Sequence, residues 1–396
     1  MVYTLAVVMK PSIFLFFQHV RPDAGAGALR ASCVLDQLEA KFPSGAIKVY
    51  CSTKAPMSVG SIKFRCCGFQ IDNSAALLVR LLGELALGIE VAVRIAASRR
   101  PSLLIISSPA YLSAMLIICV AKARGFNYIL ELRDVYPQVY ADAGILGRQS
   151  FIFKTMRYSS SLAYKWASKV VCATHGLALE VKRDAPSSNV EVVYNGFPAA
   201  FLSRSNVVKH RRFTVCFHGV LGFFQDVDTL LLLTDRLAAD GVDVVVIGYG
   251  RKAALLKESR RSNLRFLGAL SFRETIEQVE RCHVGLSLRL SDDISRDSFP
   301  VKVWEYLGLG IPSLITPESE AGDFVKAHAC GFVFEPGDVE GIALKILSIK
   351  SNPDYLDQLK NNCLRVAEGF TREAAGVKIG ELVDEVIASK KRLRSL

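Results

Sequence analysis

The sequence SRDSFPVKVWEYLGLGIP occupies residues 295–312 and has the signals of a loop that leads into a buried helix. Pro300 suits the first turn of a helix, because its φ angle is fixed and it lacks an N–H that this turn would leave unpaired. Apolar residues then recur at helical spacing until two glycines and a proline end the pattern. Glu305 is therefore expected inside the helix, and Asp297 in the loop before it.

Two carboxylates and a lysine surround the start of this expected helix. Asp297 and Glu305 stand eight residues apart and can face one ligand, with Lys302 one turn into the helix. The unpaired N–H groups of a helix N-terminus favour anions, so a phosphorylated sugar is a suitable ligand. An acid pair at this spacing is more often solvated surface, so the rest of the chain has to decide between the two interpretations.

Short apolar segments alternate with helical segments on both sides of this stretch. Runs such as 13–17, 103–107, 213–217 and 242–247 have the continuous apolar character of buried parallel strands. A chain of 396 residues is also expected to form more than one core. The sequence therefore predicts an α/β fold of two tandem Rossmann-like, doubly wound domains that face a cleft. We place the domains at 1–205 and 206–375, with a C-terminal helix at 376–396 that could cross back to the first domain.

Glycine-rich loops follow two of the expected strands of the second domain. Gly219 and Gly222 come after the strand at 213–217, and Gly248 and Gly250 come after the strand at 242–247, with Arg251 behind them. The carboxyl ends of parallel strands share one edge of a sheet, which is where open α/β sheets bind ligands. These loops are expected to meet the 297–302 segment there.

The first domain offers a weaker set of candidates at the same kind of edge. Gly25 and Gly27 follow the first strand, with Arg30 in the helix behind them, and Arg133 and Asp134 follow the strand at 128–131. The glycines can face a ligand or simply allow a tight turn, and the two interpretations are about equally supported.

Charge is distributed unevenly along the chain. Residues 1–205 hold 23 Lys and Arg against 12 Asp and Glu, which accounts for the whole net charge of +11. This excess favours an anionic partner for the first domain, such as a lipid surface or a phosphorylated acceptor. The segment 151–169 mixes aromatic and basic residues, which is typical of a helix at a membrane interface or, as we favour, of a packed helix with solvated bases.

The remaining bulk features exclude several classes of protein. The ten cysteines are scattered with no metal-ligand spacing, which favours a reduced, cytosolic compartment and argues against a structural zinc site. The apolar residues 1–18 lack the basic start of a signal peptide. The run 103–120 is better explained by a strand, a turn and a helix than by a membrane span.

Taken together, these motifs resemble the retaining glycosyltransferases of family 4, which have the two-domain architecture called GT-B. The resemblance covers about residues 13–390 and is most specific from Phe266 to Pro312, where the family has an acid, seven residues and a glutamate. The form of this motif is similar to the branch found in bacterial surface-polysaccharide gene sets. Other segments that match in order are Arg133–Pro137, Asn195–Gly196, Gly219–Gly222 and Gly248–Gly250.

The resemblance implies a role for each candidate in the donor site. Glu305 would bind the ribose hydroxyls of a nucleotide sugar, Asp297 would bind the transferred sugar, and the loop at Gly219 and Gly222 would meet the diphosphate. The pair of bases that the family commonly has in that loop is missing here. Lys302 and Arg251 are our substitutes, on charge alone, and Gly248 and Gly250 complete the expected donor site.

The resemblance also implies an acceptor site and a mechanism. Gly25, Gly27, Arg30, Arg133 and Asp134 would hold the acceptor, although the family often has a histidine where Arg133 stands. Asp134, Lys302 and Asp297 are the catalytic candidates. The family retains anomeric configuration by same-face attack and needs no cofactor, and no D-x-D triplet is present to hold a metal.

The function expected from this resemblance is transfer of a hexose or N-acetylated aminosugar, from UDP rather than GDP, to a lipid-linked saccharide in polysaccharide synthesis. The enzyme would be cytoplasmic and peripheral at the inner face of the cytoplasmic membrane. One alternative is an epimerase of the same shape. Another is a non-catalytic protein that binds sugar nucleotides or nucleic acid, although no nucleic-acid recognition motif is present.

Overall fold

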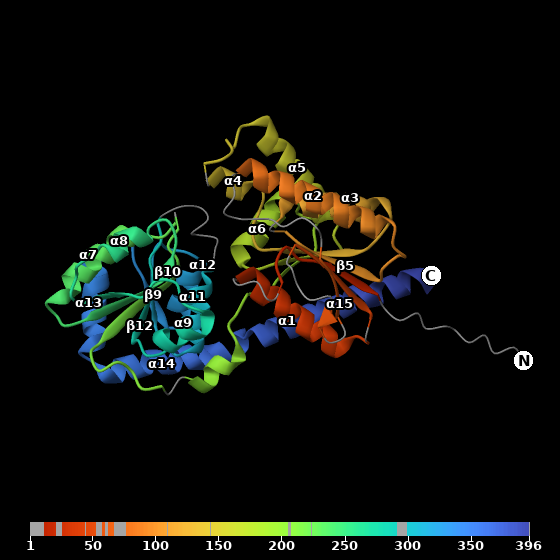
Figure 1. Ribbon diagram of the computed structural model, residues 1–396. Coiled ribbons are helices and arrows are strands. Elements are labelled where there is room, and N and C mark those ends of the chain that lie inside the picture. Colours follow the sequence, from red (N-terminus) through yellow and green to blue (C-terminus); the bar gives the residue numbers. More distant parts are fainter. Residues whose placement is uncertain are drawn as a thin grey trace, which may run out of the picture. The chain divides into compact units, whose positions relative to one another are not determined.

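The computed structural model describes residues 12–20, 26–43, 45–52, 58–59, 62–66, 77–108, 110–142, 144–204, 207–222, 224–290 and 299–395. Its contacts divide the chain into two compact units, residues 1–194 with 375–396, and residues 195–374 (Figure 1). Each unit is a largely parallel sheet with helices around it. The α/β fold of two doubly wound domains is therefore confirmed. The predicted Asp297 and Gly25 lie outside the described residues, as do residues 1–11.

The sheet of the first unit has eight strands in the order β3-β4-β2-β1-β5-β6-β7-β8, and only β3 runs antiparallel to its neighbour. Helices α2, α3, α5 and α6 contribute to the core on one face, and α1 and α15 contribute to the core on the other. The elements of this unit are β1 (Ile13–Phe16), α1 (Ala26–Lys41), β2 (Ile47–Cys51), β3 (Ser58–Val59), β4 (Ile62–Cys66), α2 (Leu77–Ala96), β5 (Leu103–Ser107), α3 (Tyr111–Ala123), β6 (Tyr128–Leu132), α4 (Gln138–Asp142), α5 (Phe151–Trp166), β7 (Lys169–Cys172), α6 (His175–Asp184), β8 (Val190–Val192) and most of α15 (Arg372–Ser395).

The sheet of the second unit has six parallel strands in the order β11-β10-β9-β12-β13-β14. The strand order reverses between β9 and β12, which makes that point the place where a doubly wound sheet opens a crevice for a ligand. The elements are η1 (Ala199–Arg204), β9 (Thr214–Val220), α7 (Val227–Ala238), β10 (Asp243–Tyr249), α8 (Ala253–Lys257), β11 (Leu264–Phe266), α9 (Phe272–Val279), β12 (Val284–Ser287), α11 (Val301–Gly308), β13 (Ser313–Ile315), α12 (Glu320–Ala327), β14 (Gly331–Val333), α13 (Val339–Lys350), α14 (Pro353–Ala367) and η2 (Glu368–Phe370).

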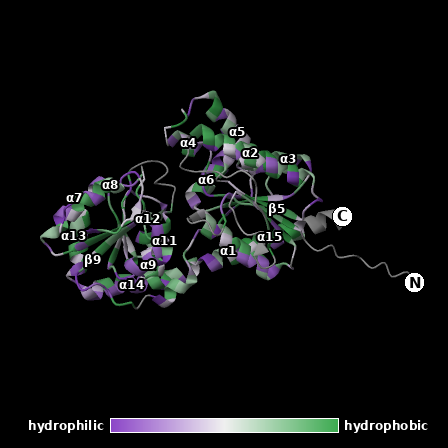
Figure 2. Ribbon diagram, viewed as in Figure 1, coloured by the Kyte–Doolittle hydropathy of each residue, from purple (hydrophilic) through white to green (hydrophobic). Residues whose placement is uncertain are grey.

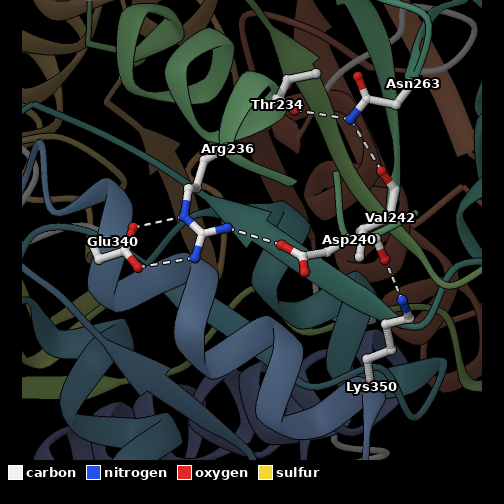
Figure 3. A network of polar contacts seen from close by, with 7 residues as sticks. All are labelled: Thr234, Arg236, Asp240, Val242, Asn263, Glu340 and Lys350. Atoms are coloured by element: carbon white, nitrogen blue, oxygen red, sulfur yellow. Dashed lines mark hydrogen bonds and ion pairs between the residues drawn. The ribbon is translucent and has the colours of Figure 1, made fainter. Parts of the chain in front are cut away.

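Apolar strands form the centre of both units (Figure 2). The residues of β1, β5, β6 and β7 are all buried, because helices cover both faces of a parallel sheet and leave no strand face in water. Around the second sheet, Arg236 of α7 pairs with Glu340 of α13 and with Asp240 (Figure 3). The Asn263 amide donates hydrogen bonds to the carbonyl groups of Thr234 and Val242. The Arg236 contacts are partly solvated, so they fix geometry more than they stabilise the fold.

The first boundary between the units differs from the expected one at 205. It falls between Tyr194 and Asn195, because the segment 195–205, which we assign to the first domain from the sequence, is part of the second unit. Within it, η1 contacts α11, and Phe201 is buried between the rings of Phe197 and Phe272. At the other end, the unit boundary follows Ala374, and the remainder of α15 belongs to the first unit.

Among the described residues, no helix combines the length and hydropathy needed to cross a bilayer. The apolar run 103–120 forms β5 and α3 on either side of a short connection, as its serines and proline predict.

Candidate functional site in the second unit

Helix α11 lies at the switch point between β9 and β12. It begins directly after Pro300, as the sequence predicts, and almost all of its length is buried. Tyr306 fixes its depth by donating a hydrogen bond from its hydroxyl to the carbonyl oxygens of Cys216 (3.2 Å) and Leu286 (3.3 Å), on β9 and β12. The ring lies so close to β12 that a Cβ at Gly285 would come within 2.5 Å of it. This packing places Lys302 and Glu305 at the carboxyl ends of the two strands.

Lys302 is a buried cation at the end of β9. Its Nζ lies 3.7 Å from the centre of the Phe217 ring and donates to Gln225 Oε1 at 3.2 Å. A Cβ added to Gly219 would lie 3.8 Å from the same Nζ, so the lysine reaches the start of the first glycine loop. Burial, with a smaller effect of Arg289, lowers the pKa of Lys302 to about 7. An ammonium group without full solvation is held ready for an anion at this position.

Glu305 stands between a histidine and an arginine. Its Oε2 is 3.5 Å from Nε2 of His218, and its Oε1 is 3.8 Å from Nη2 of Arg372. Burial raises the pKa of Glu305 to about 7, against the opposing effects of Arg372 and Lys302. Burial and Lys302 lower the pKa of His218 to about 3, so the imidazole is neutral at pH 7 and its contact with Glu305 is not an ion pair.

His218 retains hydrogen-bonding capacity in this position. Its Nε2 is buried and makes no hydrogen bond to any residue that the structure describes. Buried nitrogen atoms in native proteins are nearly always paired, so one that faces a carboxylate at the edge of a sheet is poised to bind a ligand or water. In the sequence, His218 is the last residue before the glycine loop, and this position could have identified it as a candidate.

Arg289 is a second cation that the sequence analysis missed. It lies two residues beyond the end of β12, is buried, and its backbone N–H donates to Thr316 Oγ1 at 2.9 Å. Residues 225 and 289 form an isolated bridge, so the arginine backbone lies beside the residue that accepts the Lys302 hydrogen bond. Its charge is close enough to lower the pKa of Lys302. A base at the carboxyl end of a central strand was the available signal.

The two glycine loops lie side by side, as expected. Leu221 N–H donates to the Tyr249 carbonyl at 2.7 Å, and a Cβ at Gly248 would come within 2.0 Å of the Gly219 carbonyl oxygen. Gly250 is similarly close to Leu221. Gly248 and Gly250 are thus required for the approach of the two backbones. A Cβ at Gly222 would make only an ordinary contact, 3.7 Å from Val220, and Arg251 is exposed behind the second loop.

In the first unit, three of the predicted residues gather around a carboxylate that the sequence analysis did not single out. Glu131, at the end of β6, is buried and pairs with Arg30 and, at 3.6 Å, with Arg133. Burial works to raise the Glu131 pKa, but the two arginines outweigh it and hold that pKa below its usual value. Arg133 lies so close to Gly27 that a Cβ there would meet Nη1 at 2.3 Å.

Asp134 lies beside this cluster and lines a different space. It borders a cavity of about 20 Å³ whose wall includes Ser108, Tyr136 and Tyr164. Burial raises the pKa of Asp134, and Arg133 opposes the increase. Such a cavity can hold about one water molecule but no sugar. The acceptor-binding roles of these residues stay predictions.

No cluster of three or more His, Cys, Asp or Glu that could hold a metal ion occurs in the described part of the chain. The cysteines that the structure describes in full are all free thiols, and most are buried.

Comparison with known proteins agrees with this geometry. Residues 200–365 match the family model described as glycosyl transferases group 1. The chain is 24% identical over 308 residues to the probable glycosyltransferase WbjE of Pseudomonas aeruginosa. This match covers 73% of this chain and 76% of WbjE.

Solved structures share the fold over nearly the whole chain. HepE (Alr3699) of Anabaena, crystallised with UDP, is 16% identical with a TM-score of 0.69, over 94% of this chain and 100% of HepE. The sucrose-phosphate synthase of Thermosynechococcus elongatus is 14% identical with a TM-score of 0.71, over 96% of this chain and 100% of that one. Residues 200–365 are therefore similar to glycosyl transferases of group 1, and the chain has a two-domain fold of the GT-B type.

Proposed function

We propose that this protein transfers a hexose or N-acetylated aminosugar from a UDP-sugar to a lipid-linked saccharide, with retention of anomeric configuration. The observation that carries the proposal is the buried Lys302 ammonium at the end of β9, next to the first glycine loop and near Arg289. HepE, which shares the fold, was crystallised with UDP. The group 1 match covers the unit that holds this site, and the name of WbjE supports the transfer reaction.

The chemistry of the leaving group explains why cations are needed there. When the bond between the anomeric carbon and the diphosphate oxygen breaks, the departing nucleoside diphosphate gains a negative charge. Lys302 and Arg289 would stabilise that charge most strongly in the transition state, in a site that excludes water. The acceptor oxygen forms the new bond on the same face, and its proton passes to the departing phosphate.

The other residues have binding roles in this proposal. Glu305 would accept hydrogen bonds from the ribose hydroxyls, held in place by Arg372 and His218. Asp297, outside the described residues, would bind the transferred sugar, and Arg251 would add charge near the diphosphate. Asp134 and its neighbours in the first unit would hold the acceptor. The two carboxylates bind substrate in this scheme and do not act as a nucleophile and acid pair.

Transfer assays test the proposal directly. Purified protein is incubated with membrane extract and radiolabelled UDP- or GDP-sugars, and labelled lipid-linked product is measured. We expect product from UDP-sugars and none from GDP-sugars. No transfer from any donor would reject the proposal. Product that forms from the donor without an acceptor would instead indicate an epimerase.

The pH dependence of UDP binding should report the state of Lys302. The pKa of this amine is about 7 in the empty site, and a bound diphosphate would raise it. Above pH 7 the protein must therefore take up a proton to bind UDP, so the Kd for UDP should rise by up to about tenfold per pH unit from pH 7 to 9. Isothermal titration calorimetry in buffers of different ionisation enthalpy would measure both the affinity and the proton uptake.

A matched variant separates Lys302 from other groups that titrate in this range. Lys302→Arg keeps a cation that does not lose its proton below pH 9. Its UDP affinity should change much less over the same range. An equal slope in both proteins would assign the titration to a group other than Lys302. Glu305, whose pKa is also about 7, would give the opposite trend, because its deprotonated form accepts the ribose hydrogen bonds.

A further inference from the structure

Helix α2 is apolar on its outer side as well as its inner side. Leu87, Val91 and Ile95 pack into the core of the first unit, where α2 lies along α3. On the other side, large apolar side chains are exposed at spacings of three and four residues, which places them in one stripe. They are Leu78, Leu82, Leu85, Ile89 and Val93, with Leu77 and Val79 at the start of the helix.

Such a stripe is unusual for a surface that faces water. A helix that is hydrophobic all round normally lies in a protein core or in contact with lipid, and large exposed apolar patches mark interaction sites. Leu82 and Ile89 are 56% and 51% exposed, so about half of the surface of each residue is available to a partner. Because α2 carries Arg80, Glu84, Glu90 and Arg94, it is not a helix that would cross a bilayer.

The charges of the segment that contains helices α2, α3, α4 and α5 favour an anionic partner. Among the described residues from 77 to 168, no Asp or Glu is exposed. Glu84 is buried, and Glu90 and Asp142 are partly buried and paired with Arg94 and Arg148. By contrast, nine bases of this segment are exposed: Arg94, Arg99, Arg100, Lys122, Arg124, Arg148, Lys154, Arg157 and Lys165. Three of them are paired with an acid, Arg94 with Glu90, Arg148 with Asp142 and Arg157 with Asp184.

Exposed apolar residues continue on a second helix of this layer. Helix α5, which also packs on α3, exposes Phe151, Ile152 and Tyr158 together with Lys154 and Arg157. Tyr111 joins α3 to α5, because its hydroxyl donates a hydrogen bond to the Met156 carbonyl at 3.1 Å. In Figure 1, α2, α3, α4 and α5 form one layer on the same side of the first sheet.

We infer that this layer, with the α2 stripe at its centre, docks the first unit on an anionic membrane surface. The inference rests on the proposed function, since the acceptor would be lipid-linked. The apolar side chains would enter the boundary between headgroups and acyl chains, and the bases would contact anionic headgroups. A second copy of the chain is a poorer partner, because a two-fold interface through this layer would bring like charges together.

The experiment measures binding of the full chain to vesicles by sedimentation. Phosphatidylcholine vesicles with about a quarter phosphatidylglycerol, a fraction at which surface charge attracts bases, are compared with phosphatidylcholine alone. The test variant is L82E/I89E on α2. Its matched control is L232E/L344E, at two sites of the second unit that are 57% and 56% exposed. UDP binding is measured for every protein by thermal shift.

The inference predicts binding to the anionic vesicles that weakens with added salt. The α2 variant should bind at least about tenfold more weakly, and the control variant should bind like the natural protein. Absence of vesicle binding by the natural protein, or an equal loss in both variants, would overturn the inference. So would a dimer in solution that only L82E/I89E dissociates, since the stripe would then be a subunit interface.

UDP binding distinguishes failure of this inference from failure of the proposed function. If the protein binds UDP but no vesicles, the proposed donor site stands and the inferred docking surface is rejected. If the protein binds vesicles through α2 but is not stabilised by UDP, the docking surface stands and the nucleotide-sugar proposal is rejected. Both variants lie outside the second-unit site, so neither should change the UDP response.

Discussion

Replacing Lys302 by methionine should lower the kcat of sugar transfer by about 100- to 1000-fold. The methionine fills a similar volume and keeps the contact with Phe217, but it removes the only buried ammonium that the structure describes beside the Gly219 loop. The leaving diphosphate would then develop its charge with Arg289 as the remaining buried cation. Steady-state kinetics with a UDP-sugar and a membrane extract measure the change.

Stability separates this effect from a folding defect. A buried ammonium is costly, as the lowered pKa of Lys302 indicates, so its replacement by an apolar side chain should leave the melting temperature unchanged or raise it. Lys257→Met on α8 is the control, because Lys257 is exposed and its loss should leave kcat unchanged. A Lys302→Met protein that retains kcat within a factor of about three would exclude Lys302 from leaving-group stabilisation.

Replacing Glu305 by alanine should abolish transfer. If the carboxylate binds the ribose hydroxyls, its loss removes charge-assisted hydrogen bonds worth about 1.5–3 kcal/mol each, or roughly 10- to 100-fold in UDP affinity per bond. A misplaced donor would then lower kcat as well, because the reacting atoms no longer meet. Calorimetry with UDP and the transfer assay measure the two parts separately.

Two further variants test whether the loss of UDP affinity comes from the missing carboxylate. Glu305→Gln keeps the shape and one acceptor oxygen, so it should lose less UDP affinity than the alanine variant. Arg372→Lys changes the partner of Glu305 and should alter UDP affinity in the natural protein but not in the Glu305→Ala background. A fully active Glu305→Ala enzyme would refute the assignment of this residue to the donor.

The secondary structure of this chain could be predicted well where strands are buried on both faces. Such strands appear as uninterrupted apolar runs, so the run 103–107 predicts β5 with its observed ends, and the run 13–17 exceeds β1 by one residue. Strand β4, with the sequence IKFRC, was missed. It lies between β2 and β3 near the edge of its sheet, and its alternating bases resemble a solvated loop.

The candidate site was only partly accessible to sequence reasoning. Lys302, Glu305 and the glycine loops could be found, because each is next to a strand end or a helix start in the chain. Arg372 could not, since 67 residues separate it from the Glu305 carboxylate that it approaches. Glu131 was hidden for a related reason, because its partner Arg30 lies 101 residues earlier.

The sequence by itself determined the alternation of strands and helices and the edge of the sheet at which the second-unit loops meet. These properties follow from local hydrophobic patterns and from the rule that parallel strands end together. Only the tertiary structure decided the protonation of the site and the exposure of α2. Burial by distant elements brings the pKa values of Lys302 and Glu305 to about 7 from opposite sides. Large apolar side chains on one face of α2 stay exposed in the part of the chain that the structure describes. Both depend on which parts of the chain exclude water, which local sequence does not specify.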